Sequence, residues 1–197
     1  YLTEFRPDFQ PPEDLTAFLA ALHQAKNQHY AALLEAGQLP LRPGVERLFE
    51  EALHHNVRLA IATTTSPENV TNLLASTLGR DSLSWFQVIG AGDIVPAKKP
   101  APDIYDYVLE AMDLPARRCL AFEDSANGLR SARDAGLATI ITLNDYTRDH
   151  DFSEAALVLD HLGEPDQPCQ VMAGEPADIR RVDMAVVAEV FKRAYDH

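Results

Sequence analysis

Two adjacent acidic residues follow a short apolar run in the second half of the chain. Residues 119–122 read as a buried strand, and Glu123 and Asp124 come directly after it. Like charges side by side repel each other unless a cation offsets them. Adjacent carboxylates without an evident neutralising partner indicate a hard cation, and Mg²⁺ accepts one or two protein carboxylates together with water and phosphate oxygens. We therefore expect Glu123 and Asp124 to bind Mg²⁺.

Two other groups of polar residues follow apolar runs in the same way. Thr63 and Thr64 open the sequence Thr-Thr-Thr-Ser, which follows residues 57–62 and leads directly into a helix pattern. Lys98 and Lys99 follow the apolar run 86–91. Hydroxyl and backbone N–H groups at a helix N-terminus bind oxyanions, and a lysine adds a compact positive charge. These residues are candidates for binding phosphate.

Each group also has an ordinary structural explanation. Threonines before a helix are usually caps, paired lysines are usually solvated, and acids before a helix often only complement its dipole. All three groups, however, follow predicted strands, and the carboxyl ends of parallel strands meet at one edge of the sheet, where ligands bind. Taken together they favour one shared site for a cation and a phosphate.

The elements that position these residues alternate regularly after residue 57. Strands are predicted at 57–62, 86–91, 119–122 and 138–143, with a fifth at an edge over 155–160. Helical patterns separate them, each entered through proline or serine. The alternation predicts an α/β fold with a doubly wound parallel sheet. A helix over 182–195 follows, and the tail over 163–181 reads as irregular.

Only helical patterns precede the α/β region. Residues 12–35 read as one long helix with an apolar stripe, starting at Pro12 and stopping at Gly37. A shorter helix begins at Val45. We expect residues 1–41 to form a part separate from an α/β core over 42–197.

Composition narrows the range of partners. The chain has 197 residues, 46% of them hydrophobic, which suffices for one sizeable core or for a core with a small appended piece. A net charge of −13 argues against nucleic acid and anionic membranes. Cys119 and Cys169 lack metal or redox spacing, which favours reduced thiols and a cytoplasmic protein, or a stromal one in a plastid. We expect a monomer.

The motifs resemble those of the haloacid dehalogenase-like hydrolases, over residues 45–143. That family has a Thr or Ser ending a strand, which "LAIATTTS" matches with Thr63, and a Lys before Pro, which "KKPAPDIY" matches with Lys99. Its acidic pair is matched by Glu123 and Asp124 in "FEDSANGLRSARDAG". The run "ITLNDYTRDHDF" is similar to the CbbY-type branch, whose members resemble β-phosphoglucomutase.

The resemblance implies a Mg²⁺-dependent phosphatase of a small sugar phosphate, such as xylulose-1,5-bisphosphate, or alternatively a β-phosphoglucomutase-like phosphotransferase. Thr63 and the Thr64 backbone would bind the transferring phosphoryl group, and Lys99 would offset charge. Asp124 would bind Mg²⁺ with Glu123 beside it. Residues 1–41 would be the remainder of a helical cap.

The family's first motif, Asp-x-Asp-x-Thr, is absent from the 197 residues. Its first Asp becomes an aspartyl phosphate, and its second is the general acid and base. The only Asp-x-Asp here, at 149–151, lacks the Thr and reads as a polar loop. Two explanations remain. In the first, the nucleophile lies upstream of Tyr1, on a strand between those that end near Thr63 and Glu123. The start of the sequence at Tyr instead of Met favours this explanation. Otherwise the chain is a non-catalytic remnant that binds a phosphorylated ligand or a protein.

Overall fold

The computed structural model of the chain describes residues 8–10 and 12–195 and has the predicted α/β fold. It divides into two compact units, Tyr1–Leu39 and Pro40–His197. This division lies close to the boundary that we predicted after residue 41. The assignment of the first unit to a helical cap stays a prediction.

One long helix makes up most of the first unit. Helix α2 spans Leu15–Glu35 and begins three residues later than Pro12, where the sequence pattern placed its start. The reason is local, because the Asp14 carboxylate accepts a hydrogen bond from the backbone N–H of Ala17 at 2.9 Å and so caps the helix. Among the described residues, neither this helix nor any other is long and apolar enough to cross a bilayer.

The second unit contains two sheets. One pairs β1 (Leu59–Ala62) with β2 (Phe86–Gly90) in parallel. The other has the order β3-β4-β5-β6, and its members are β3 (Leu120–Glu123), β4 (Ala138–Thr142), β5 (Leu157–Leu159) and β6 (Val171–Gly174). Its first three strands are parallel. Within the described residues β1 and β3 do not pair with each other, and a strand between them stays a prediction.

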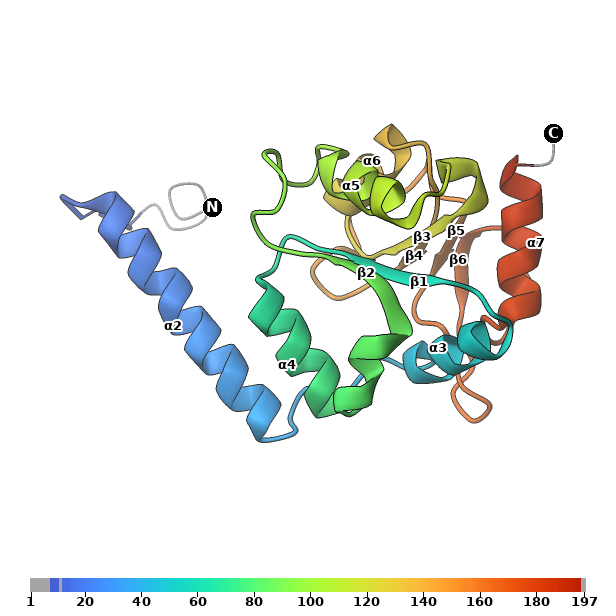
Figure 1. Cartoon of the computed structure of the whole chain (residues 1–197), viewed down its shortest axis with the longest axis horizontal. Helices are drawn as coiled ribbons and strands as arrows, with labels where there is room; N and C mark the ends of the chain where they lie inside the picture. The colour runs from blue at the N-terminus through green and yellow to red at the C-terminus, as the bar shows by residue number, and fades with distance from the viewer. Residues whose placement is uncertain (1–7, 11, 196–197) are drawn as a thin grey trace. The chain divides into compact units, whose positions relative to one another are not determined.

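Helices cover the strands on two sides, as a doubly wound sheet requires. Figure 1 shows α5 and α6 on one side of the strands and α3 and α4 on the other. Adjacent residues of β4 point to opposite faces. Ile140 joins a cluster with Leu48 of α3 and Val190 of α7, while Ile141 joins Leu129 of α6. The helices of the second unit are α3 (Val45–His54), α4 (Pro67–Thr77), α5 (Asp103–Met112), α6 (Ala126–Asp134) and α7 (Met184–Tyr195). Two short 3₁₀ helices lie at Arg80–Trp85 and Ala116–Arg118.

The tail differs from the prediction in two respects. Residues 163–181 were predicted to be irregular, but they contain β6, which pairs antiparallel with β5. Consequently β5 is not an edge strand, and all three of its residues are buried. The short run that forms β6 has exposed side chains at three of its four positions. It therefore lacks the alternation of apolar and polar residues by which a half-buried strand is found.

Arg47 of α3 joins segments that are far apart in the sequence. Its guanidinium donates to the carboxylates of Glu51, at 2.8 Å, and Glu164, at 3.3 Å. It also donates to the backbone carbonyls of Gly163, at 2.8 Å, and Val182, at 3.0 Å. One half-buried side chain thus fixes α3 to the tail and to the segment that enters α7.

Candidate active site

The chain turns from β1 into α4 through a series of hydroxyl side chains. The backbone N–H of Thr63 donates to the carbonyl of Gly90 at 2.9 Å and so extends the pairing of β1 with β2. The Thr63 hydroxyl oxygen accepts a hydrogen bond from the N–H of Thr65 at 3.2 Å. A hydroxyl that accepts through its oxygen retains its proton for another acceptor. Ser66 caps α4 as predicted, and Thr64 is exposed.

Lys99 connects the carboxyl ends of two strands that do not pair. Its ammonium donates to the carbonyl of Ala62 at 2.9 Å, at the end of β1, and to the Glu123 carboxylate at the end of β3. It also lies 4.8 Å from the centre of the Tyr105 ring, a cation–π distance. The side chain is only 14% exposed. Lys99 therefore brings the region of Thr63 and the acidic pair to one edge.

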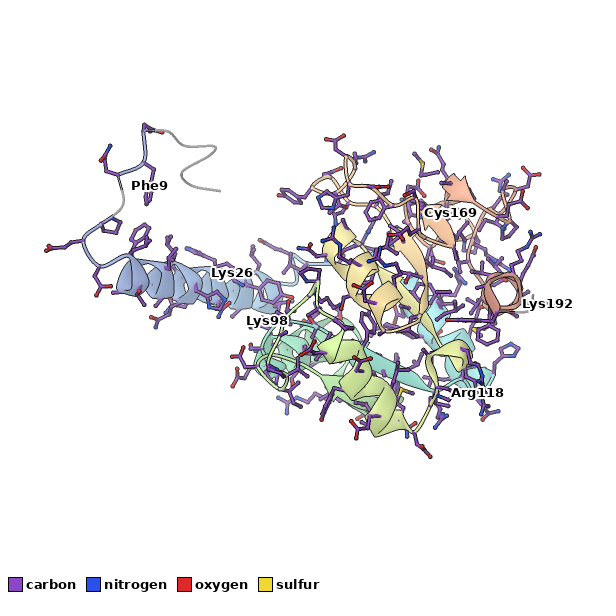
Figure 2. All side chains as sticks on the ribbon, turned by 90° about the horizontal axis from the view of Figure 1, so that it is seen from above. Phe9, Lys26, Lys98, Arg118, Cys169 and Lys192 are labelled. Atoms are coloured by element: carbon purple, nitrogen blue, oxygen red, sulfur yellow. The ribbon has the colours of Figure 1, made fainter. Side chains whose placement is uncertain are left out.

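Lys98 takes no part in this arrangement. It forms an ion pair with Asp93 at 2.7 Å, and its side chain is 52% exposed. Figure 2 labels it on the loop that leads from β2 to α5. The hydrogen bond and positive charge of Lys98 lower the pKa of the Asp93 carboxyl. The two adjacent lysines thus have different roles, one in the site and one on the surface.

Glu123 is held from two sides. One oxygen, Oε1, accepts from both the Lys99 ammonium and the Tyr105 hydroxyl. Burial, and then the negative charge of Glu123, raise the pKa of the Tyr105 phenol well above its ordinary value, so the phenol remains a donor. The acidic pair therefore has a neutralising partner, Lys99, which the sequence pattern did not reveal.

The first turn of α6 leaves room for this carboxylate. Gly128 lies so close to Glu123 that a Cβ at residue 128 would come within 1.9 Å of Oε2. Ser125 caps the same turn, because its hydroxyl accepts from the N–H of Gly128 at 3.1 Å. The sequence Glu-Asp-Ser-Ala-Asn-Gly thus combines a carboxylate, a helix cap and the space that the carboxylate occupies.

Asp124 has a different environment from Glu123. It is exposed, and its Oδ2 accepts from the side-chain amide of Asn144 at 3.1 Å. Among the described residues no group of three or more His, Cys, Asp or Glu side chains converges on one point. One open carboxylate fits Mg²⁺, which usually keeps several waters and uses one or two carboxylates with substrate phosphates. It does not fit a metal that needs an all-protein cage.

Three residues of the site were not predicted. Tyr105 and Gly128 lie within the motifs quoted above, "KKPAPDIY" and "FEDSANGLRSARDAG", where each had been read only as part of a helix. Asn144 follows β4 and so also lies at a strand's carboxyl end, which was the available signal. The candidates Thr63, Lys99, Glu123 and Asp124 all follow or end strands, as expected, and Lys99 contacts Glu123 directly.

The sequence of the chain is similar to those of proteins in a known family. A model of the haloacid dehalogenase-like hydrolases matches residues 2–136. The plasmid protein CbbY of Cupriavidus necator is 49% identical over 148 residues, which are 75% of this chain and 58% of that protein. The chain spans 58% to 64% of the length of three CbbY proteins that it matches.

Solved structures agree with this similarity. A CbbY variant from Rhodobacter sphaeroides, in complex with xylulose-1,5-bisphosphate, is 45% identical with a TM-score of 0.68 and covers 72% of this chain and 63% of its own. A putative β-phosphoglucomutase from Thermotoga maritima is 25% identical with a TM-score of 0.60, and the match covers 75% of this chain and 66% of that one. Both likenesses extend over most of the chain.

Proposed function

The chain belongs to the haloacid dehalogenase-like hydrolases, and from this premise we propose that it serves in the Mg²⁺-dependent hydrolysis of a small sugar phosphate. The observation that carries the proposal is the position of Lys99, which links the end of β1 beside Thr63 to Glu123 beside Asp124. A donor hydroxyl, an ammonium group and an open carboxylate then share one edge. These are the groups that a phosphoryl group and its cation require.

Lys99 has the capacity to bind a phosphoryl oxygen where it stands. An ammonium group has three protons, and two of them are used for Ala62 and Glu123. The third remains for an oxygen of the substrate. Glu123 and Tyr105 fix the direction of the ammonium before the substrate arrives, and such preorganised donors stabilise charge that develops in the transition state.

Thr63 and Thr64 supply the neutral donors. The Thr63 oxygen accepts from Thr65, so its own proton can be donated to an incoming oxygen. The backbone N–H of Thr64 lies in the same turn before α4, where N–H groups and the helix dipole favour an anion. Charge on the phosphoryl oxygens is thereby shared between neutral donors and Lys99.

Asp124 is the residue that we assign to Mg²⁺, with Glu123 beside it as the partner of Lys99. Bound Mg²⁺ would supply a positive charge for the phosphate oxygens. The contact of Asp124 with Asn144 is to a neutral amide, which does not form an ion pair with the carboxylate. The two acids would thus have different roles, because Glu123 orients Lys99 and Asp124 binds the cation.

The identity of the substrate is supported by the relatives. The CbbY structure from Rhodobacter sphaeroides contains xylulose-1,5-bisphosphate, and at 45% identity it is the basis for proposing a pentulose bisphosphate here. The carboxylate that accepts the phosphoryl group in this family belongs to the Asp-x-Asp-x-Thr motif, which the 197 residues do not contain. We propose that this motif is supplied by sequence upstream of Tyr1, which the coding sequence can show.

Phosphate release by the full-length gene product tests the proposal. We expect inorganic phosphate from xylulose-1,5-bisphosphate in the presence of Mg²⁺, and a loss of turnover in Asp124→Asn far larger than in Asp93→Asn, an exposed acid outside the site. Glu123→Gln is expected to lose activity through Lys99 while retaining its dependence on Mg²⁺ concentration. Near-normal Mg²⁺ dependence in Asp124→Asn would contradict the assignment.

A second candidate is a phosphotransferase like β-phosphoglucomutase, which the similarity to the Thermotoga maritima structure favours. The same donors would return the phosphoryl group to a sugar hydroxyl instead of to water. Incubation with a sugar phosphate separates the two: isomerised sugar phosphate without phosphate release supports the transferase, and stoichiometric release of phosphate supports the phosphatase.

A further inference from the structure

The loop after β4 contacts the residues on both sides of the α6 cap. Asn144 donates to the carboxylate of Asp124 at 3.1 Å, and Nδ1 of His150 accepts from the N–H of Ala126 at 3.3 Å. These two contacts enclose Ser125, the cap residue of α6. The loop 144–150 therefore lies against the segment that carries the acidic pair.

The side-chain amide of Asn144 is oriented by its own turn. Its Oδ1 accepts from the backbone N–H of Tyr146 at 2.8 Å. A backbone N–H only donates, so the atom facing it must be the amide oxygen. The NH₂ group of Asn144 consequently faces Asp124 and donates its hydrogen bond to a carboxylate oxygen.

The turn itself is anchored at both ends. Thr147, 7% exposed, accepts from the N–H of Asn144 through its hydroxyl at 3.3 Å and donates its own N–H to the Asn144 carbonyl at 3.1 Å. The Arg42 guanidinium donates to the carbonyls of Thr142, at 3.3 Å, and Leu143, at 2.5 Å. The position of the Asn144 amide is thus set before any ligand binds.

From these contacts we infer that Asn144 is a positioning residue for Asp124, an inference that rests on the proposed function. The amide occupies Oδ2 with a neutral donor. Among the described residues no hydrogen bond or ion pair engages Oδ1, which is left for a divalent cation. Glu123 shows the contrast, because its charge is offset by Lys99. Asn144 restricts the rotation of Asp124 without neutralising it.

Mn²⁺ binding to the full-length gene product, followed by electron paramagnetic resonance, tests the inference without substrate or turnover. The decisive variant is Asn144→Ser. A serine hydroxyl can still accept from the N–H of Tyr146 and keep the turn, but it is too short to reach Asp124. Asn144→Thr serves the same purpose if the serine variant does not fold. Asp145→Asn, an exposed neighbour paired with Arg148, is the matched control.

We expect Asn144→Ser to weaken Mn²⁺ binding by about 10- to 100-fold, as loss of a group that orients a metal ligand typically does. Asp124→Asn should abolish specific binding, and Asp145→Asn should bind like the wild type. Wild-type affinity in Asn144→Ser, with binding lost in Asp124→Asn, would overturn the inference and leave the proposed function standing. A wild-type full-length protein that binds Mn²⁺ no better than its Asp124→Asn variant would overturn both.

Discussion

At the scale of single residues, the adjacent lysines give the sharpest comparison. Lys99 contacts Ala62 and Glu123, and we propose that its third proton is donated to the substrate, whereas Lys98 pairs with Asp93 on the surface. Loss of one donor to a transition-state oxygen typically costs about 3–4 kcal/mol. We therefore expect Lys99→Ala to lower kcat by roughly a hundred- to a thousand-fold. Lys98→Ala is the control, measured at saturating Mg²⁺, and equal small losses would remove Lys99 from the site.

Tyr105 gives a prediction about alkaline pH. Folding raises the pKa of its phenol, so the contribution of the protonated form is complete below about pH 10 and is lost as the pH rises toward the raised value. The free energy of unfolding of the wild type should therefore fall more steeply above about pH 10 than that of Tyr105→Phe. Urea unfolding at a series of pH values measures this difference.

Absorbance of the phenolate gives an independent check. Subtracting the titration of Tyr105→Phe from that of the wild type isolates one of the six tyrosines. Its ionisation should lie clearly above pH 10, the ordinary region for tyrosine. An ordinary midpoint would show that Tyr105 is not buried against Glu123.

The sequence favoured Lys99 over Lys98 as the phosphate-binding lysine, because Pro100 restricts the residue before it and the family motif places Lys before Pro, and this choice stays a prediction. The pairing of Lys99 with Glu123 was not predictable. The two residues are 24 positions apart, and their contact depends on how the ends of two strands approach each other. Asn144 illustrates the same limit, since an Asn-Asp sequence after a strand is also typical of an ordinary turn.

At the scale of elements, Gly128 decides how α6 begins. Replacing a helical glycine by alanine usually stabilises a protein by about 0.5–1 kcal/mol. Here the added Cβ would meet Glu123 at 1.9 Å, and overpacking costs typically about 1–3 kcal/mol. We expect Gly128→Ala to destabilise the chain and to displace Glu123 from Lys99, lowering kcat.

Asn127→Ala is the control for this substitution, because Asn127 is exposed in the same turn of α6. Thermal unfolding of the two variants gives the comparison. A stabilised Gly128→Ala chain would show that Glu123 has room to move.

Element boundaries were predictable where caps are encoded locally. Ser66 and Pro67 correctly placed the start of α4 because the cap needs only a side chain and the next turn. The start of α2 was misplaced because Pro12 and Asp14 are both good starting signals, and Asp14 makes the hydrogen bond. β6 was missed because its place depends on β5, and its own residues are mostly exposed.

At the scale of the whole molecule, Arg47 connects parts that the sequence separates widely. Arg47→Met would remove the donors to the carbonyls of Gly163 and Val182 and leave the Glu164 carboxylate with the backbone N–H of Gly44 but without its cationic partner. Each unsatisfied buried group costs about 1–3 kcal/mol, so we expect a loss of roughly 2–4 kcal/mol in the free energy of unfolding.

Arg193→Met is the matched control, because Arg193 is 53% exposed and pairs with Glu189 and Glu175 on the surface. Exposed pairs contribute typically about 0.2–1 kcal/mol. Urea unfolding of both variants measures the difference, and comparable losses would show that the Arg47 contacts do not hold the tail.

The overall architecture followed from the alternation of elements, whereas the connections around Arg47 did not. Parallel strands with intervening helices have few possible arrangements, so the pattern after residue 57 was sufficient for the fold class. A guanidinium with several donors can reach many carbonyls, and only the folded chain determines which ones it meets.

The central place of β4 has a consequence for the kinetics of backbone opening. β4 is bordered by β3 and β5, and its residues Ile140 and Ile141 are fully buried on opposite faces. Its backbone N–H groups donate alternately to one neighbour and the other, so both neighbours must separate before all of them are released, and in D₂O they should be the last to exchange. The amides of β2, bordered only by β1 among the described residues, should take up deuterium earlier. Exchange would then proceed inward from the two-stranded sheet, with β4 reporting the opening of the entire core.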